Sequence, residues 1–163
     1  GCGEGFTLNR LKEHGIASKL EGIEYLKNAI ELGKKEYPDI KIKQGNIYDL
    51  PYKDNFFDAA IAIAILHCIQ NKDDRNKTIS ELHRVLKPKA KLLIKVWNKD
   101  HKRFQKKPKE KYIKWLDKGA RYYYFYTEEE LLKDLKDAGF KIISSESKSG
   151  ERTNDEIIVI VEK

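Results

Sequence analysis

The chain has 163 residues, of which 36% are charged, and its net charge is +7 at pH 7. This length suits one domain with a full core, and no apolar run approaches the ~20 residues that a membrane-spanning helix needs. Cys2 and Cys68 form no Cys-x-x-Cys pair, so neither a zinc knuckle nor a disulfide framework is indicated. No segment has the pattern of a signal peptide, so we expect a cytoplasmic protein.

The chain opens on a glycine-rich pentapeptide, Gly1-Cys2-Gly3-Glu4-Gly5, which leads into a helical pattern. A glycine turn that feeds a helix is a common way for an α/β sheet to meet a nucleotide-like cofactor. The spacing differs from the Gly-x-Gly-x-x-Gly of dehydrogenases, whose loop wraps a pyrophosphate. The shorter loop favours a ligand without phosphate at this point, such as S-adenosylmethionine. A plain glycine turn is the alternative interpretation.

Helical and strand patterns alternate after this loop. The first helix reaches about Gly15, a short strand ends at Glu24, and the next helix stops before Pro38. Glu24 follows Gly5 at close to the ~20-residue distance expected for a carboxylate that binds ribose hydroxyls. The segment from Ile40 to Lys43 alternates apolar and basic residues, which is typical of an edge strand.

The middle of the chain predicts the centre of a sheet. Residues 56–66 form a near-continuous apolar run, as expected for a parallel strand buried on both faces. A helix over residues 73–86, ended by Pro88, leads to a second buried strand over 92–97. Strands that alternate with helices in this way indicate βαβ units.

The last third predicts a capped helix and two strands. A capping box begins at Thr127 and the helix closes at Gly139. Residues 141–147 and 156–162 then have strand patterns separated by a loop over 149–154, so we expect an antiparallel pair. The whole chain, residues 1–163, therefore reads as a single α/β domain with a mostly parallel twisted sheet, helices on both faces and a C-terminal antiparallel strand pair.

A basic insertion over residues 98–120 interrupts this pattern. Nine basic and three acidic residues lie between Lys99 and Lys118, which leaves +6 in twenty residues. Such an excess is typical of a surface that binds a polyanion; a solvated lysine-rich loop is the alternative. The insertion leads directly into Arg121 and a run of tyrosines, whose rings could stack on unpaired bases or simply fill a strand core.

These motifs, in this order, resemble the class I S-adenosylmethionine-dependent methyltransferases across essentially the whole chain. The resemblance implies a Rossmann-like fold whose first strand, which precedes the glycines in the family, is missing from this chain. The family usually has Gly-Gly where this chain has Lys89-Ala90, and often Asp where it has Asn46. The implied cofactor-binding residues are Gly1, Cys2, Gly3, Gly5, Glu24, Asn46, Ile47 and Ile63.

Three stretches further resemble the tRNA wobble-uridine methyltransferases that esterify 5-carboxymethyluridine: Ile61 to His67, Val96-Trp97 and Arg121 to Tyr123. The family has histidine where Cys68 and Tyr124 stand. The resemblance implies that His67 and Arg121 orient the substrate acid, as the catalytic pair. It also implies a tRNA partner and a small zinc-binding activator at the Ile40–Lys43 edge. The expected substrate-binding residues are Tyr122, Tyr123, Lys102, Arg103, Lys106 and Lys107.

The expected chemistry is simple. A carboxylate that attacks a sulfonium methyl group is already ionised at neutral pH, so the protein needs mainly to align the reactants. No Asn/Asp-Pro-Pro-Tyr motif follows the fourth strand of the family pattern, which argues against an exocyclic amino group as target. A methyltransferase for a small metabolite and a catalytically inactive RNA-binding subunit remain the alternatives. His67 could instead be a packed side chain, and Arg121 could form a structural salt bridge.

Overall fold

The computed structural model describes residues 1–114, 119–148 and 156–163, and it divides into two compact units, residues 1–51 and 52–163. Each unit has its own helices and its own hydrogen-bonded strands. Residues 115–118 of the basic insertion and the predicted loop over 149–154 lie outside the described residues. No helix in the described ranges is long and apolar enough to cross a membrane.

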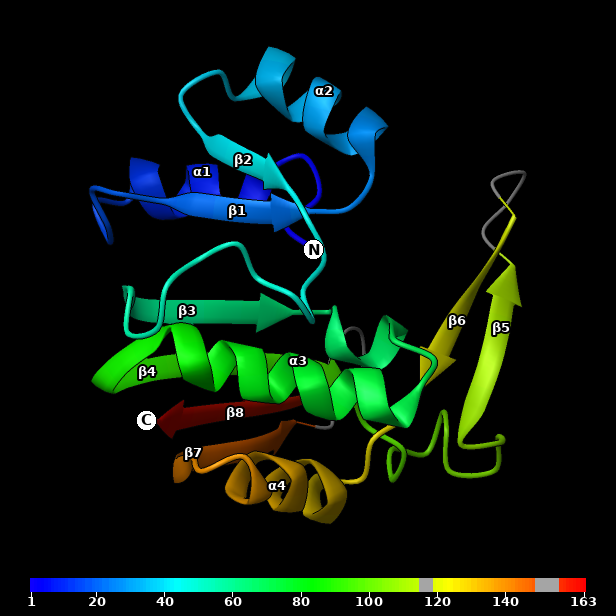
Figure 1. Cartoon of the computed structure of the whole chain (residues 1–163). Helices are drawn as coiled ribbons and strands as arrows, with labels where there is room; N and C mark the ends of the chain where they lie inside the picture. Colours follow the sequence, from blue (N-terminus) through cyan, green and yellow to red (C-terminus); the bar gives the residue numbers. More distant parts are fainter. Residues whose placement is uncertain (115–118, 149–155) are drawn as a thin grey trace. The chain divides into compact units, whose positions relative to one another are not determined.

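The first unit alternates helices and strands as the sequence predicts. Its elements are α1 (Phe6–Glu13), β1 (Glu21–Glu24), α2 (Lys27–Glu36) and β2 (Lys41–Gln44) (Figure 1). The two strands pair in parallel, with Glu21 opposite Lys41 and Glu24 opposite Gln44. Among the described strands β2 pairs with β1 alone, so the predicted edge strand is confirmed.

Two glycines of this unit allow its elements to approach the glycine-rich loop closely. A Cβ on Gly33, inside α2, would lie 2.4 Å from the carbonyl oxygen of Glu4. A Cβ on Gly22, inside β1, would lie 2.4 Å from Sγ of Cys2. Real Cβ atoms do not come so near to other atoms, so a larger residue at either position would displace the loop.

The second unit is a four-stranded sheet with two helices and a separate hairpin. The sheet order is β3-β4-β8-β7, with β3 parallel to β4 and β8 antiparallel to both β4 and β7. The C-terminal antiparallel pair is therefore confirmed, and the sheet is mixed. The bounds are β3 (Phe57–Ile63), the 3-10 turn η1 (Leu66–Cys68), α3 (Lys72–Val85), β4 (Leu86–Trp97), β5 (Glu110–Lys114), β6 (Ala120–Tyr124), α4 (Glu128–Asp137), β7 (Lys141–Lys148) and β8 (Glu156–Glu162).

The core of this unit lies between the sheet and its helices. Helix α3 packs on β4, α4 packs on β7, and the two helices contact each other, so both cover the same face (Figure 1). Alternate residues of β4 and β8 are fully buried, as amphipathic strands require. These residues are Leu92, Ile94, Val96, Ile157, Val159 and Val161.

The structure corrects the prediction for the apolar run over residues 56–66. Strand β3 was expected to be buried on both faces, yet Phe56 just before it is 47% exposed and Ile61 within it is 38% exposed. The physical reason is its place in the sheet: among the described strands β3 has a hydrogen-bonded neighbour, β4, on one edge only. Residues along its other edge have no neighbouring strand to pack against among the described residues.

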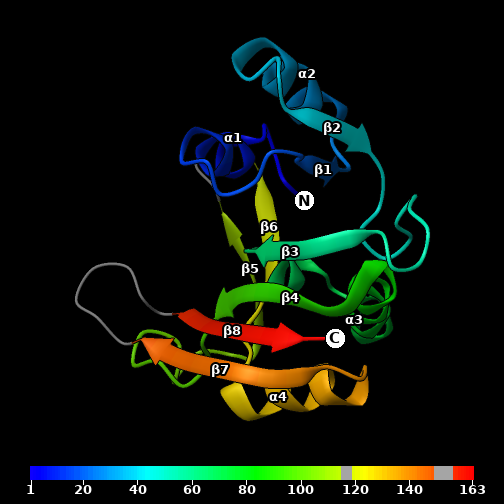
Figure 2. The same cartoon turned by 90° about the vertical axis from the view of Figure 1, so that its left-hand side faces the viewer.

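The structure also shows strand at the predicted end of a helix and within the basic insertion. Helix α3 ends at Val85, and β4 begins at Leu86 rather than at residue 92. The basic insertion contains β5, which pairs antiparallel with β6 to form a hairpin beside the sheet (Figure 1); in Figure 2 the same hairpin runs behind the sheet. Helix α4 begins as predicted, because the Thr127 side chain accepts the N–H of Glu130 at 3.2 Å.

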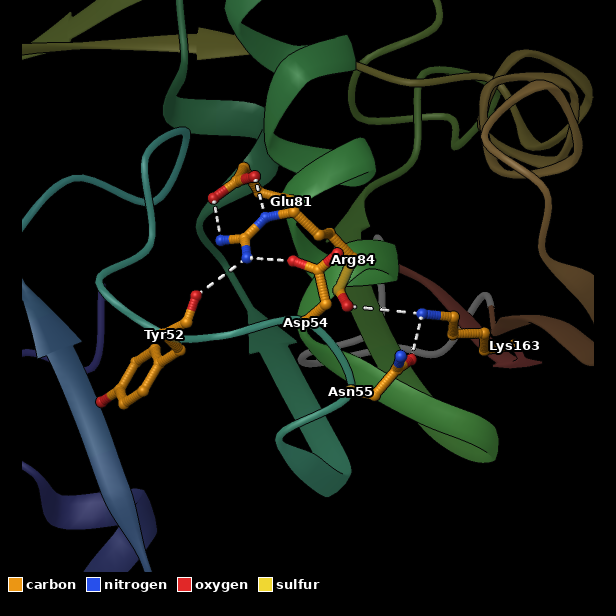
Figure 3. A network of polar contacts seen from close by, with 6 residues as sticks. All are labelled: Tyr52, Asp54, Asn55, Glu81, Arg84 and Lys163. Carbon is orange, nitrogen blue, oxygen red and sulfur yellow. Dashed lines mark hydrogen bonds and ion pairs between the residues drawn. The ribbon is translucent and has the colours of Figure 1, made fainter.

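Arg84, at the end of α3, fixes the loop that enters β3 (Figure 3). Its Nη1 donates to the carbonyl of Tyr52 and to Asp54, both at 2.8 Å, while Nε and Nη2 bond both oxygens of Glu81. Hydrogen bonds to these carboxylates raise the pKa of the guanidinium further above its ordinary value. Lys163 Nζ completes the network by donating to Asn55 at 2.8 Å.

Strain at Lys89 gives a test of the backbone geometry. Lys89 has a φ of 66°, a left-handed conformation that costs a residue with a Cβ about 1–2 kcal/mol. Lys89→Gly is therefore expected to raise the free energy of unfolding by about 0.5–1 kcal/mol, after allowing for the freedom of glycine in the unfolded chain. Urea denaturation would measure the difference. Lys89→Ala, which keeps the strain, is the control; a glycine variant no more stable than the alanine variant would contradict the prediction.

Candidate functional site

In the first unit, the Glu24 carboxylate ties the glycine-rich loop to the end of β1. Its Oε2 accepts the N–H of Gly3 at 2.8 Å, and its Oε1 accepts the N–H groups of Tyr25 and Leu26 at 2.8 and 2.9 Å. Burial acts to raise the pKa of Glu24, but the backbone N–H groups outweigh it and hold that pKa below its ordinary value. The carboxylate is therefore ionised at neutral pH.

The same carboxylate keeps an acceptor position that a ribose hydroxyl could use. A carboxylate offers about four acceptor positions, and the three N–H groups leave one of them, on Oε2, available. The carbonyl of Glu24 accepts the N–H of Gly45 at 3.0 Å, so Asn46 and Ile47 follow directly after this contact. Asn46 in turn accepts the N–H of Asp49 at 3.3 Å, which closes the turn.

The rest of the loop is built by backbone hydrogen bonds. The N–H of Cys2 donates to Ile23 at 2.9 Å, and the N–H of Gly5 donates to Cys2 at 3.1 Å. Gly5 has a φ of 91° and caps α1, while the thiol of Cys2 packs above Gly22. In the first unit Gly3 thus contacts the Glu24 carboxylate, Gly1, Cys2 and Gly5 belong to the same loop, and Asn46 and Ile47 follow the contact of Gly45 with the Glu24 carbonyl. A carboxylate acceptor beside a glycine-rich loop fits the ribose of S-adenosylmethionine; Ile63 lies in the second unit, at the end of β3.

In the second unit, three stretches of chain meet at an aromatic cluster. The ring of His67 in η1 stacks on Trp97 at the end of β4, with centroids 5.2 Å apart, and lies 5.6 Å from Tyr123 of β6. Trp97 stacks on Tyr123 at 4.4 Å. His67 and Tyr123 are buried, with 2% and 4% exposed.

His67 is neutral and holds a single tautomer. Burial, together with the charge of Lys95, lowers the pKa of His67 to about 4. Nδ1 accepts the backbone N–H of Trp97 at 3.1 Å, so the proton of the neutral ring is on Nε2. His67 is therefore a hydrogen-bond donor at neutral pH, and its Nδ1 lone pair is not available to act as a base.

One backbone feature and one side chain hold η1 and the residues after it in place. Ala64, just after β3, has a φ of 58°, and its N–H donates to Lys95 at 3.0 Å, which turns the chain out of the sheet. Arg75 is only 5% exposed and donates through Nη1 to the carbonyls of Ile69 and Gln70 at 2.9 and 2.8 Å. Sequence reasoning missed Arg75 because nothing in an amphipathic helix pattern marks a buried arginine.

Arg121 lies on β6, opposite Ile113, and is exposed. Burial raises the pKa of the Cys68 thiol to about 11, and the positive charge of Arg121 opposes this effect. Arg121 is therefore within electrostatic reach of the residue next to His67. The protonated Cys68 thiol also donates to the carbonyl of Ala64 at 3.4 Å, which does not suit a nucleophile.

A buried phenylalanine anchors the basic insertion, which is called the basic segment from here on. Phe104 is 2% exposed and stacks on Phe125 and Trp97, with centroids 4.5 and 5.5 Å away. The cationic groups of Arg103 and Lys107 each lie 5.1 Å from the centroid of the Phe104 ring. Lys102 and Lys106 are exposed. Sequence reasoning missed Phe104, although a lone aromatic residue in a lysine-rich stretch is a usable signal.

The tyrosine run is mostly core. Tyr123, Tyr124 and Tyr126 are 4%, 8% and 0% exposed, whereas Tyr122 is half-buried. The hydroxyl of Tyr126 is buried without a hydrogen-bond partner among the described residues. Substrate binding by Tyr122 and Tyr123 stays a prediction, and only Tyr122 of this run presents part of its ring to solvent.

The geometry agrees with the family to which the chain belongs. A family model described as a methyltransferase domain matches residues 1–94, more than half of the chain. The chain belongs to this family of methyltransferase domains. Family and fold together imply S-adenosylmethionine as the cofactor.

Curated relatives act on different substrates. The 2-phytyl-1,4-naphtoquinone methyltransferase of Nostoc sp. is 37% identical over 100 residues, covering 57% of this chain and 42% of that protein. The tRNA (carboxymethyluridine(34)-5-O)-methyltransferase of Arabidopsis thaliana is 51% identical over 49 residues, covering 30% of this chain and 12% of that protein. The chain thus spans less than half the length of both relatives.

Solved structures show the same fold. A SAM-dependent methyltransferase of Methanosarcina mazei matches with a TM-score of 0.86 and 24% identity, covering 100% of this chain and 89% of that one. A methyltransferase solved with the Trm112 methyltransferase activator of Haloferax volcanii matches with a TM-score of 0.78 and 14% identity, covering 99% of this chain and 78% of that one. The predicted Rossmann-like methyltransferase fold is confirmed.

Glu24 gives a test of the cofactor assignment. Glu24→Ala removes both the ribose acceptor and the bond to the N–H of Gly3, so we expect the affinity for S-adenosylmethionine to fall at least ~10-fold, as for the loss of a charged hydrogen bond. Isothermal titration calorimetry on the full-length protein would measure it. Glu21→Ala, on the same strand, removes ion pairs with Lys41 and Lys43, leaves the Glu24 carboxylate in place and is the control. Equal affinities in the two variants would show that Glu24 does not bind the cofactor.

Proposed function

We propose that the protein is an S-adenosylmethionine-dependent methyltransferase that acts on tRNA and forms a methyl ester on a carboxymethyl group of the wobble uridine. One observation carries the proposal. The three stretches that resemble the wobble-uridine enzymes lie far apart in sequence, yet His67, Trp97 and Tyr123 pack against one another. The similarity to the Arabidopsis enzyme over 49 residues supports the same conclusion.

The electrostatics of His67 suit a carboxylate substrate. A carboxylate attacks the methyl group without losing a proton, so the reaction needs no general base. His67 has no free lone pair at Nδ1 and offers an Nε2–H donor instead. In the proposed complex His67 would donate to one oxygen of the substrate acid, and Arg121 would supply the positive charge that draws the acid in.

The basic segment suits a tRNA substrate. In the described residues 99–114 and 119–121 there are nine basic and two acidic side chains. Lys102, Arg103, Lys106 and Lys107 are all exposed. Exposed cations of this density bind phosphates through counterion release, so RNA affinity is expected to fall steeply as salt rises.

A small-molecule substrate is the second candidate. The quinone methyltransferase of Nostoc is similar over a longer stretch, 100 residues, than the tRNA enzyme. The buried aromatic cluster beside His67 could pack against an apolar ring as well as against a base. Methyl transfer in the absence of RNA would favour this candidate.

A small zinc-binding activator remains part of the proposal. Strand β2 has a free edge among the described strands, and such an edge can accept a strand from a partner. The Haloferax methyltransferase of the same fold was solved with an activator. Co-purification of the full-length protein with a small zinc-containing protein would support the activator; a fully active protein purified alone would contradict it.

The substrate assignment is tested by transfer of tritium from labelled S-adenosylmethionine to bulk tRNA from a strain that lacks the enzyme. We expect the full-length protein to place label in tRNA that mild base releases, because a methyl ester is hydrolysed where other methyl groups are not. His67→Ala and Arg121→Ala are expected to lose at least ~10-fold in rate. Base-stable label would rule out a methyl ester as the product, and absence of label in tRNA would rule out tRNA as the substrate.

The protonation state of His67 gives a separate test. Because the pKa of His67 is lowered to about 4, the ring stays neutral as pH rises from ~5 to ~8. The methylation rate should therefore show no step near the ordinary histidine value of ~6.5. His67→Gln, which keeps a neutral donor, should retain more activity than His67→Ala. A step near ~6.5 that disappears in His67→Gln would show instead that His67 titrates during the reaction.

A further inference from the structure

The hairpin of β5 and β6 presents two tyrosine rings on one face. Tyr112 and Tyr122 are directly opposite in the antiparallel register, so their side chains project from the same face. Their rings meet edge to face, with centroids 5.6 Å apart and planes at 70°. Tyr112 is 57% exposed, an unusual exposure for a large ring, and Tyr122 is half-buried.

Both rings are held by their contact with each other and, in addition, by hydrogen bonds of their hydroxyl groups. Tyr112 donates to the side-chain oxygen of Gln70 at 3.2 Å, and Tyr122 donates to Glu110 at 2.6 Å. Gln70 follows η1 by two residues, and its carbonyl also accepts a bond from Arg75 at 2.8 Å. The Tyr112 ring is therefore attached to the segment that directly follows η1, the turn that carries His67.

Charges of both signs lie near the rings: the Glu110 carboxylate is hydrogen-bonded to Tyr122, and three cations lie along the hairpin. Lys114 projects from the same face as Tyr112, because alternate residues of a strand share a face, and Lys114 is exposed. Lys111 and Arg121 are exposed on the other face of the hairpin. Rigid, exposed aromatic rings among cations are the combination that binds single-stranded nucleic acid, since every base has a face that can stack.

Building on the proposed function, we propose that Tyr112 and Tyr122 form a platform on which an unpaired base of the RNA substrate stacks, while Lys114 contacts a neighbouring phosphate. The opposite face of the hairpin packs Tyr123 and Ile113 into the aromatic cluster. A base held on the platform would thus be positioned relative to His67 through Gln70. Sequence reasoning assigned Tyr122 to the substrate and missed Tyr112.

The test compares RNA binding by variants of the full-length protein, measured by fluorescence anisotropy with bulk tRNA and with an oligouridylate strand. Tyr112→Leu removes the ring and is expected to weaken binding of both probes about tenfold. Tyr112→Phe keeps the ring but loses the bond to Gln70, and should bind within about twofold of the unchanged protein. Tyr112→Trp, with a larger ring, should bind at least as tightly.

Two controls separate stacking from charge and from general damage. Lys114→Ala should reduce the steepness of log affinity against log salt by about 1, the contribution of one phosphate contact. Tyr112→Leu should leave this slope unchanged. Phe56→Leu removes an exposed ring outside the hairpin and should not change binding. Unfolding curves for each variant show whether the fold is kept.

The outcomes distinguish the platform from the proposed function. If Tyr112→Leu binds both probes like the unchanged protein, the platform is wrong while the tRNA substrate stands. If Tyr112→Phe loses as much affinity as Tyr112→Leu, the hydroxyl rather than the ring face matters, and stacking is wrong. If the unchanged protein methylates tRNA but does not bind oligouridylate, the platform is also wrong. If it binds oligouridylate but does not methylate tRNA, only the proposed function is wrong.

Discussion

The second unit depends on the indole ring of Trp97. It stacks on His67, Phe104, Tyr123 and Phe125, with centroid distances between 4.4 and 5.9 Å. These four rings come from η1, from the basic segment and from the last residues of the hairpin and the stretch after it. Its backbone N–H also fixes the tautomer of His67. One residue at the end of β4 therefore contacts His67, the basic segment and the hairpin, and sets their relative positions.

Much of the fold could be predicted because regular elements leave periodic patterns. The edge strand β2, the cap of α4 at Thr127 and the antiparallel pair β7–β8 follow from alternation and capping residues alone. The exposure of β3 could not be predicted in this way. An apolar run predicts a strand, but whether the strand is central or at an edge depends on pairing partners that the run itself does not encode.

The same distinction, between local patterns and contacts across the chain, applies to the residues of the candidate site. Glu24 and the glycines could be singled out from the sequence, because cofactor binding of the proposed kind needs particular residue types at fixed spacings. Arg75, Phe104 and Tyr112 were not, because their roles arise from contacts between segments far apart in sequence. Arg75 sits in an ordinary helical pattern, and Tyr112 lies in a stretch whose lysines suggested a solvated loop. Lys89 is an instructive case, since the resembled family has glycine there and the structure gives it a φ that favours glycine.

The two units use different physical means for their proposed tasks. In the first, the described contacts around Glu24 are hydrogen bonds to backbone N–H groups, which depend little on salt and suit one invariant cofactor. In the second, stacked rings and exposed cations surround a neutral histidine. Stacking tolerates different bases, and phosphate contacts carry no sequence information. Selection of one nucleoside would then fall to the groups that contact the reacting acid, His67 and Arg121, rather than to the basic segment.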